Sequence, residues 1–274
     1  MKKTKRILPG FGLSLGVTMS YLSLIVLIPM ISLAIQAGEA GWGGFVRAIT
    51  DQRILSSYKV SFGCSFLAAL LNVLFGTLLA WVLVRYRFFG RRLIDGLIEL
   101  PFAIPTAVAG ISLTFLTTDQ GWIGKPLASL GIRVAYTQVG IIVALIFITL
   151  PFVVRSIQPI LEELSPDYEE AGRTLGAGSA RIFFKIILPE IKPALLTGFS
   201  LAFARGLGEY GSVIFIAGNK PFQTEIAPLM IVTRLEEFHY EQATAVALVT
   251  LLASFIIMFL VNRIQSRAAR YAGG

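Results

Sequence analysis

Two charged residues lie inside an otherwise apolar stretch of the sequence. Arg205 and Glu209 fall within residues 193–217, with Arg205 near the middle of the block. An arginine at the centre of a bilayer costs roughly 2.5–3.5 kcal/mol on insertion scales, so it usually faces a bundle interior or an aqueous path. The two residues are one helical turn apart and can pair. Two interpretations stay open: Arg205 meets an anion in transit while Glu209 keeps it from being trapped, or the two form a structural ion pair. Three glycines flank the pair and allow close backbone approach: Gly206, Gly208 and Gly211.

A second group of residues predicts a short amphipathic helix in a polar stretch. Ser165 is a favourable N-cap, Pro166 suits the first helical position, and Gly176 is a natural C-terminal stop, so about ten residues should be helical. Its apolar or small residues at i, i+3, i+4 and i+7 are Tyr168, Ala171, Gly172 and Leu175. Because two of the four are small, a partner could approach closely. A helix resting on the membrane surface is the alternative.

Another short helix is expected a few residues further on. Ser179 can cap residues 180–188, and Pro189 should end them, because proline lacks the N–H that a helix interior needs. The polar stretch from Ser165 to Pro189 should therefore contain two short helices.

Side chains typical of enzyme active sites are scarce. Cys64 and His239 are each the only residue of their type, and no His/Cys/Asp cluster has metal-ligand spacing. The sequence also has no glycine-rich loop that ends in Gly-Lys-Ser or Gly-Lys-Thr, so we do not expect this chain to hydrolyse ATP. We expect Cys64 to be buried in an apolar run and His239 to lie at the surface.

The apolar residues come in long blocks. Hydrophobic residues make up 55% and charged residues 15%, and the mean hydropathy is +0.75. A soluble domain carries about 25% charged residues. Blocks of about 18 or more apolar residues predict helices that cross the ~30 Å hydrocarbon core. We expect about six, of which the third is interrupted by Pro101, Pro105 and Gly110 and the fourth is short: residues 11–35, 60–84, 97–116, 139–154, 193–217 and 243–261.

The cations lie between the blocks, so the net charge of +8 reflects membrane topology and not nucleic-acid binding. With a cytoplasmic N-terminus, sixteen of the 24 Lys and Arg residues flank cytoplasmic ends and seven flank outer ends. The positive-inside rule then places both termini in the cytoplasm. A basic start could indicate a signal peptide, but 25 apolar residues exceed its core of about 7–15 residues. We therefore expect a retained helix.

The polar stretch resembles the EAA loop of ABC-importer permeases. That pattern is Glu-Ala-Ala, three residues, Gly, nine residues, then Ile-x-Leu-Pro, and every spacing matches here. One residue departs from it, since Gly172 stands where the pattern has alanine. The matching residues are Glu170, Ala171, Gly172, Gly176, Ile186, Leu188 and Pro189. The resemblance implies that the first loop helix docks onto a separate ATPase subunit.

Further segments look like the sulfate/thiosulfate permeases of this class: residues 6–16, 86–110, 150–164 and 206–219. Molybdate permeases share the proline-rich third helix and the Gly-Leu-Gly-Glu segment, so the resemblance leaves them as the alternative. It implies an all-α integral membrane protein with the type I ABC importer permease fold. Residues 1–53 would hold the N-terminal tail, the first helix and the first outer loop; 54–264 the transmembrane core with a cytoplasmic coupling loop at 155–192; and 265–274 a cytoplasmic tail.

The resemblance also implies the partners. They are a second homologous permease chain, typically a different one, two ATPase subunits that use the ATP, an external sulfate/thiosulfate-binding protein, and membrane lipid. No cofactor is expected on this chain, and no nucleic acid. The expected location is a bacterial inner membrane, with a plastid membrane as the alternative. An ion-gradient-driven secondary transporter would often show inverted repeats, and we find none.

Overall fold

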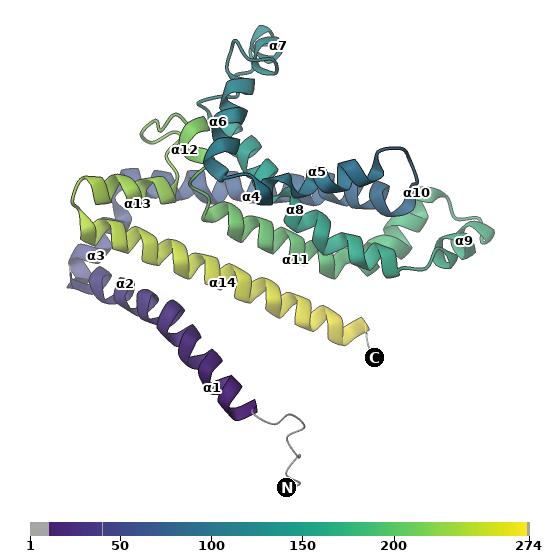
Figure 1. Cartoon of the computed structure of the whole chain (residues 1–274), viewed down its shortest axis with the longest axis horizontal. Helices are drawn as coiled ribbons and strands as arrows, with labels where there is room; N and C mark the ends of the chain where they lie inside the picture. The colour runs from purple at the N-terminus through teal and green to yellow at the C-terminus, as the bar shows by residue number, and fades with distance from the viewer. Residues whose placement is uncertain (1–10, 40, 273–274) are drawn as a thin grey trace.

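The computed structural model describes residues 11–39 and 41–272 (Figure 1). The N-terminal cations Lys2, Lys3, Lys5 and Arg6 lie outside this part, as do the side chains of Arg267 and Arg270. Every regular element within it is a helix, and two are π-helical turns, η1 and η2. The elements are α1 Phe11–Leu22, η1 Ser23–Leu27, α2 Ile28–Glu39, α3 Gly41–Thr50, α4 Gln52–Arg85, α5 Arg91–Ala103, α6 Thr106–Thr117, α7 Gly124–Ser129, α8 Gln138–Glu163, α9 Asp167–Thr174, α10 Ser179–Ile182, η2 Phe183–Ile187, α11 Leu188–Leu207, α12 Val213–Ile216, α13 Ala227–Glu236 and α14 Tyr240–Ala272.

The predicted all-α membrane architecture is confirmed. The described residues contain five helices long and apolar enough to cross a membrane, or six when a bent pair is counted as one span. The five are Phe11–Glu39, Gln52–Arg85, Gln138–Glu163, Ser179–Leu207 and Tyr240–Val261. The bent pair is α5 and α6, which meet at 113°.

The third apolar block is two helices and not one. Pro105 precedes α6, and Ile104 has the extended backbone (φ −92°, ψ 132°) that a residue before proline prefers. Proline also offers no N–H to continue the helix. As a result α6 turns away from the bundle, whereas α5 lies along it (Figure 1).

The fourth and fifth spans extend further toward α9 than predicted. The fourth, α8, has 26 residues and passes through Pro151 and Pro159, so the prediction of a short helix was wrong. Prolines are tolerated in membrane helices where neighbours satisfy the freed carbonyls. Pro189 likewise does not end a helix. It follows the wider π-helical turn η2, which adapts the helix to the missing N–H, so the span runs on from Ser179 to Leu207.

The core of the bundle is made by α4, α8 and α11. Small residues let their backbones approach: a Cβ on Gly76 would lie 2.9 Å from Val153 Cγ1, and one on Gly198 would lie 2.9 Å from Val153 Cα. The Asn72 amide donates to Ile146 O (3.0 Å) and to Thr149 Oγ1 (2.8 Å), so the polar group in the second span joins α4 to α8. Cys64 is buried as predicted.

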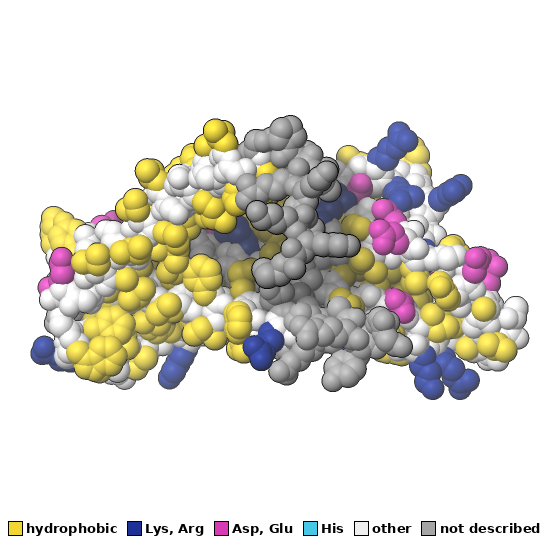
Figure 2. All heavy atoms as spheres, turned by 90° about the horizontal axis from the view of Figure 1, so that it is seen from below, with side chains coloured by type: hydrophobic (Ala, Val, Ile, Leu, Met, Phe, Trp, Pro, Cys, Tyr) yellow, Lys and Arg dark blue, Asp and Glu magenta, His cyan; other side chains and the backbone are white. Residues whose placement is uncertain are grey.

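The remaining spans are peripheral. α14 packs against α11, α13 and α2, and none of the most apolar window of the first span is buried. Apolar side chains cover much of the face that Figure 2 shows, while charged side chains gather toward the end where α9 and α10 lie. Such a broad apolar surface fits a lipid or a protein partner. The described C-terminal end of α14 lies at the same end of the bundle as α9 (Figure 1).

Candidate functional site

The loop helix α9 forms where its capping residues predict it. Ser165 Oγ accepts the Asp167 N–H (3.3 Å), and Pro166 O accepts the N–H groups of Glu169 (2.9 Å) and Glu170 (3.1 Å). All three acidic residues lie in the first turn, where the helix dipole favours negative charge. The helix has eight residues, slightly fewer than the expected ten.

Gly176 ends α9 through its backbone conformation. Its φ is +78°, in the left-handed region. The Gly176 N–H donates to Arg173 O (2.9 Å), and the Ala177 N–H donates to Gly172 O (3.0 Å). This pair of bonds is the Schellman motif, in which the residue with positive φ is usually glycine. The predicted C-terminal stop is therefore confirmed.

The apolar and small residues of α9 do not all face the same side. Gly172 is buried, and a Cβ there would lie 3.1 Å from both Ile182 Cγ1 and Ile186 Cδ1. An alanine here would require these isoleucine side chains to shift by a few tenths of an ångström. By contrast, Tyr168 is 59% exposed, Leu175 is 87% exposed, and Ala171 also faces outward. The outward residues form a face that a partner can cover.

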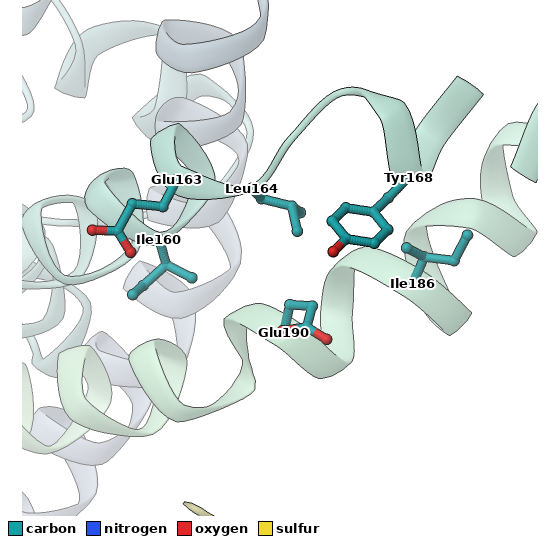
Figure 3. A pocket seen from close by; sticks show the side chains of 6 residues that line it. All are labelled: Ile160, Glu163, Leu164, Tyr168, Ile186 and Glu190. Atoms are coloured by element: carbon teal, nitrogen blue, oxygen red, sulfur yellow. The ribbon is translucent and has the colours of Figure 1, made fainter. Parts of the chain in front are cut away.

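The other residues of the predicted loop motif differ in their exposure. Glu170 is exposed on α9, Ile186 and Leu188 are half-buried, and Pro189 is exposed on the long helix that follows. Between α8, α9 and this helix lies a pocket of about 310 Å³. Figure 3 shows Tyr168 and Glu190 reaching into the space between the helices, with Glu163 at the other end. Hence α9 is not packed tightly along its whole length.

One ion pair at this loop was not predicted from the sequence. Arg85 Nε lies 2.9 Å from Glu169 Oε1, and both side chains are largely buried, with exposed fractions of 15% and 11%. Arg85 Nη2 also donates to Leu164 O (3.1 Å), and its guanidinium lies 5.7 Å from the Trp81 ring centroid. The partners are far apart in sequence, so no local spacing indicates this contact.

The pair in the fifth span forms as predicted, but at the end of its helix. Arg205 is in the last turn of α11, which ends at Leu207 because the glycine-rich segment follows; the expectation that Arg205 lies near mid-helix was wrong. Arg205 Nη1 lies 2.6 Å from Glu209 Oε2. The Glu209 side chain is 2% exposed and that of Arg205 is 36% exposed. The backbone N–H and the hydroxyl of Ser212 both donate to Glu209 Oε1 (2.9 Å each).

The Arg205–Glu209 pair lies beside the break between α5 and α6. A Cβ on Gly211 would lie 2.1 Å from Thr106 Oγ1, and one on Gly110 would lie 2.3 Å from Ser212 O. At Gly110, only glycine allows so close an approach to the backbone of Ser212. The buried carboxylate of Glu209 is thus held by its own loop, while the side chain of Arg205 is partly exposed.

A second buried carboxylate was also missed from the sequence. Glu225 is buried before α13, and Arg53 Nε in α4 donates to its Oε2 (2.9 Å) and Oε1 (3.2 Å). This pair joins the start of α4 to the loop before α13. Within the described residues, no group of three or more His, Cys, Asp or Glu side chains could hold a metal ion.

A helical membrane bundle with a short loop helix, α9, between two long spans fits the membrane component of a transporter. The family model for binding-protein-dependent transport system inner membrane components matches residues 72–270, and the chain belongs to this family. It is therefore an integral inner-membrane protein and the permease component, not the ATPase, of such a transporter.

Curated relatives extend the similarity to nearly the whole chain. The sulfate transport system permease protein CysT of Escherichia coli (strain K12) is 48% identical over 271 residues, covering 99% of this chain and 98% of the relative. The protein of the same name from Synechococcus elongatus is 44% identical, covering 93% of this chain and 92% of the relative.

Solved structures support the fold. A bacterial alginate ABC transporter in complex with its oligosaccharide-bound periplasmic protein matches with a TM-score of 0.76 at 20% identity, over 93% of each chain. The inward-facing methionine ABC transporter matches with a TM-score of 0.58 at 18% identity, over 78% of this chain and 95% of the other. The predicted permease fold is thus confirmed.

Proposed function

We propose that this chain is the permease subunit of an ATP-driven importer that carries sulfate or thiosulfate into the cytoplasm. The assignment of the substrate rests on the 48% identity to sulfate transport permeases over 99% of the chain. The chain would form the path together with a second, homologous and different permease. An external sulfate/thiosulfate-binding protein would deliver the anion.

The outward face of α9 supports a contact with an ATPase subunit. Tyr168, Ala171 and Leu175 are exposed beside the acidic Glu170, and tyrosine is among the residues that contribute most to protein–protein interfaces. Two ATPase subunits, one for each permease, would bind there and use the ATP. Glu170 would lie within this contact.

At the other end of α11, Arg205 would meet the anion while Glu209 orients its guanidinium. The supporting feature is the asymmetry of exposure, since the carboxylate is buried and the guanidinium is partly open. A planar guanidinium with several N–H donors suits an oxyanion. The negative charge of Glu209 would keep the anion from being held tightly.

We place both termini in the cytoplasm of a bacterium. The cation distribution supports this orientation, and so does the position of α14's C-terminal end at the same end of the bundle as α9 (Figure 1). A relative from Nephroselmis olivacea, 43% identical over 94% of this chain, makes a plastid membrane the alternative.

Reporter fusions test this orientation. A fusion at Gly274 and one after Gly41, which lies between the first two spans, should report opposite sides of the membrane. An alkaline phosphatase fusion should be active only after Gly41 and a fluorescent-protein fusion only at Gly274. The same side for both positions would contradict the six-span arrangement.

Uptake into proteoliposomes tests the transport function. The chain should be purified with its co-expressed neighbours and reconstituted with ATP on the ATPase side and radiolabelled sulfate with binding protein on the other. We expect uptake that requires both ATP and the binding protein, and that excess thiosulfate inhibits. Stronger inhibition by molybdate than by sulfate would assign the molybdate class, and uptake driven by an ion gradient without ATP would exclude an ABC importer.

A further inference from the structure

Few contacts join α9 to the rest of the protein. Its backbone neighbours are mainly in α10, and Gly172 packs against Ile182 and Ile186. On another side the pocket bounded by Tyr168 and Glu190 leaves it unsupported (Figure 3). The ion pair between Arg85 and Glu169 therefore stands out as a buried polar connection between α9 and a membrane-spanning helix.

Arg85 lies where a movement of α9 could be passed on to the core helices. It is the last residue of α4, whose 34 residues pack against both α8 and α11. A continuous helix is stiff along its axis, so a force applied at one end is carried to the other.

We propose that Arg85 is a positioning residue that transmits movement of α9 to α4, and so links the ATPase contact to the transmembrane core. This inference rests on the proposed ATPase contact of α9. Glu169 is the buried acid of the first turn of α9, whereas the adjacent Glu170 is exposed. The side of the turn that carries Glu169 thus contacts the bundle, and the side that carries Glu170 is open to the ATPase subunit.

The guanidinium of Arg85 has neighbours on several sides. One edge faces Glu169, another donates to Leu164 O where α8 ends, and the group lies near the Trp81 ring. Arg173 is also near Glu169, at 3.7 Å, but its side chain is 64% exposed and belongs to α9 itself. Arg173 therefore cannot connect α9 to the bundle, which makes it a matched control.

The experiment compares Arg85→Met with Arg173→Met in the reconstituted complex. Each variant removes one arginine beside Glu169, but only the first separates α9 from α4. We expect both complexes to retain the ATPase subunit and its ATP hydrolysis, while anion uptake per ATP hydrolysed falls about tenfold in Arg85→Met and stays within about twofold in Arg173→Met. Equal falls in uptake and hydrolysis would overturn the proposal.

A second measurement does not depend on the transported anion. Amide hydrogen exchange at the outer end of α4, residues 52–58, is followed with and without a non-hydrolysable ATP analogue. We expect the nucleotide to change exchange there in the wild-type and Arg173→Met complexes but not in Arg85→Met. An unchanged response in Arg85→Met would overturn the role of Arg85, whereas a wrong substrate would be seen as absent sulfate uptake by the wild-type complex.

Loss of folding is separated from loss of coupling by a further variant. Arg85→Met leaves Glu169 buried without its main partner, so the double variant Arg85→Met with Glu169→Leu removes that charge as well. We expect the double variant to regain the wild-type protein level without regaining transport per ATP. Recovery of both would reduce the ion pair to a stabilising contact and overturn the proposal.

Discussion

Replacing Arg205 by leucine is expected to reduce the amount of folded protein several-fold. The Glu209 carboxylate is 2% exposed and would lose its charged partner, while the two hydrogen bonds from Ser212 would remain. Removing one partner of a buried pair costs about 3–5 kcal/mol, and the partial exposure of Arg205 places this case at about 3 kcal/mol or below. The protein level in membranes and the thermal unfolding of purified protein measure this effect.

The double variant Arg205→Leu with Glu209→Leu should recover the protein level, because no unpaired charge is left in the core. We expect its sulfate uptake to stay at least about tenfold below wild type, since the guanidinium that meets the anion is gone. Arg205→Lys keeps the charge but loses the planar group, so it should impair uptake more than folding.

The Arg53–Glu225 pair is a matched control for a buried carboxylate. Its glutamate is also 2% exposed and its arginine 27% exposed, but it joins α4 to the loop before α13. Arg53→Leu with Glu225→Leu also leaves no unpaired charge, so it should keep the protein level and show no specific loss of uptake. Full uptake by a well-folded Arg205/Glu209 double variant would show that the pair only stabilises the fold and does not meet the anion.

Gly176→Leu is expected to reduce ATP-driven uptake at least about tenfold while the chain still inserts into the membrane. The left-handed conformation that Gly176 adopts at φ +78° costs a non-glycine residue roughly 1–2 kcal/mol. The Schellman turn that orients α9 would be displaced, and with it the face formed by Tyr168, Ala171 and Leu175. Uptake, ATP hydrolysis and co-purification of the ATPase subunit measure the loss.

Two variants control for side-chain size. Gly178 lies two residues further on and has φ −70°, and a Cβ added there would meet nothing within 4 Å, so Gly178→Leu should leave uptake unchanged. Gly176→Asn should retain most of it, because asparagine tolerates the left-handed region. Equal activity of Gly176→Leu and Gly178→Leu would contradict a coupling role for this turn.

Features set by neighbouring residues were predictable. Long apolar blocks exceed the thickness of a bilayer core, so the membrane spans could be located from the sequence, although their ends could not. The cap at Ser165 and the turn at Gly176 depend on hydrogen bonds within a few residues, and both formed as expected. Arg205 and Glu209 also pair, but not for the helical reason that predicted it, because α11 ends at Leu207 and Glu209 reaches Arg205 from the loop that follows.

Features set by contacts between distant segments were not predictable. Pro189 indicated a helix end from its missing N–H, but the π-helical turn η2 absorbs it within one long span. The length of α8 beyond Pro151 follows from packing against α4 and α11, which no local pattern records.

By itself, the sequence determined the class of this protein, its helical spans and the local form of its loop helix, because hydropathy and capping act over short distances. Only the tertiary structure decided which charges meet across the chain. Arg85 pairs with Glu169 and Arg53 with Glu225 because the packing of α4 brings its two ends beside those residues. Tertiary structure also decided that Gly172 is buried while Leu175 stays exposed, since α9 can press only one face against Ile182 and Ile186.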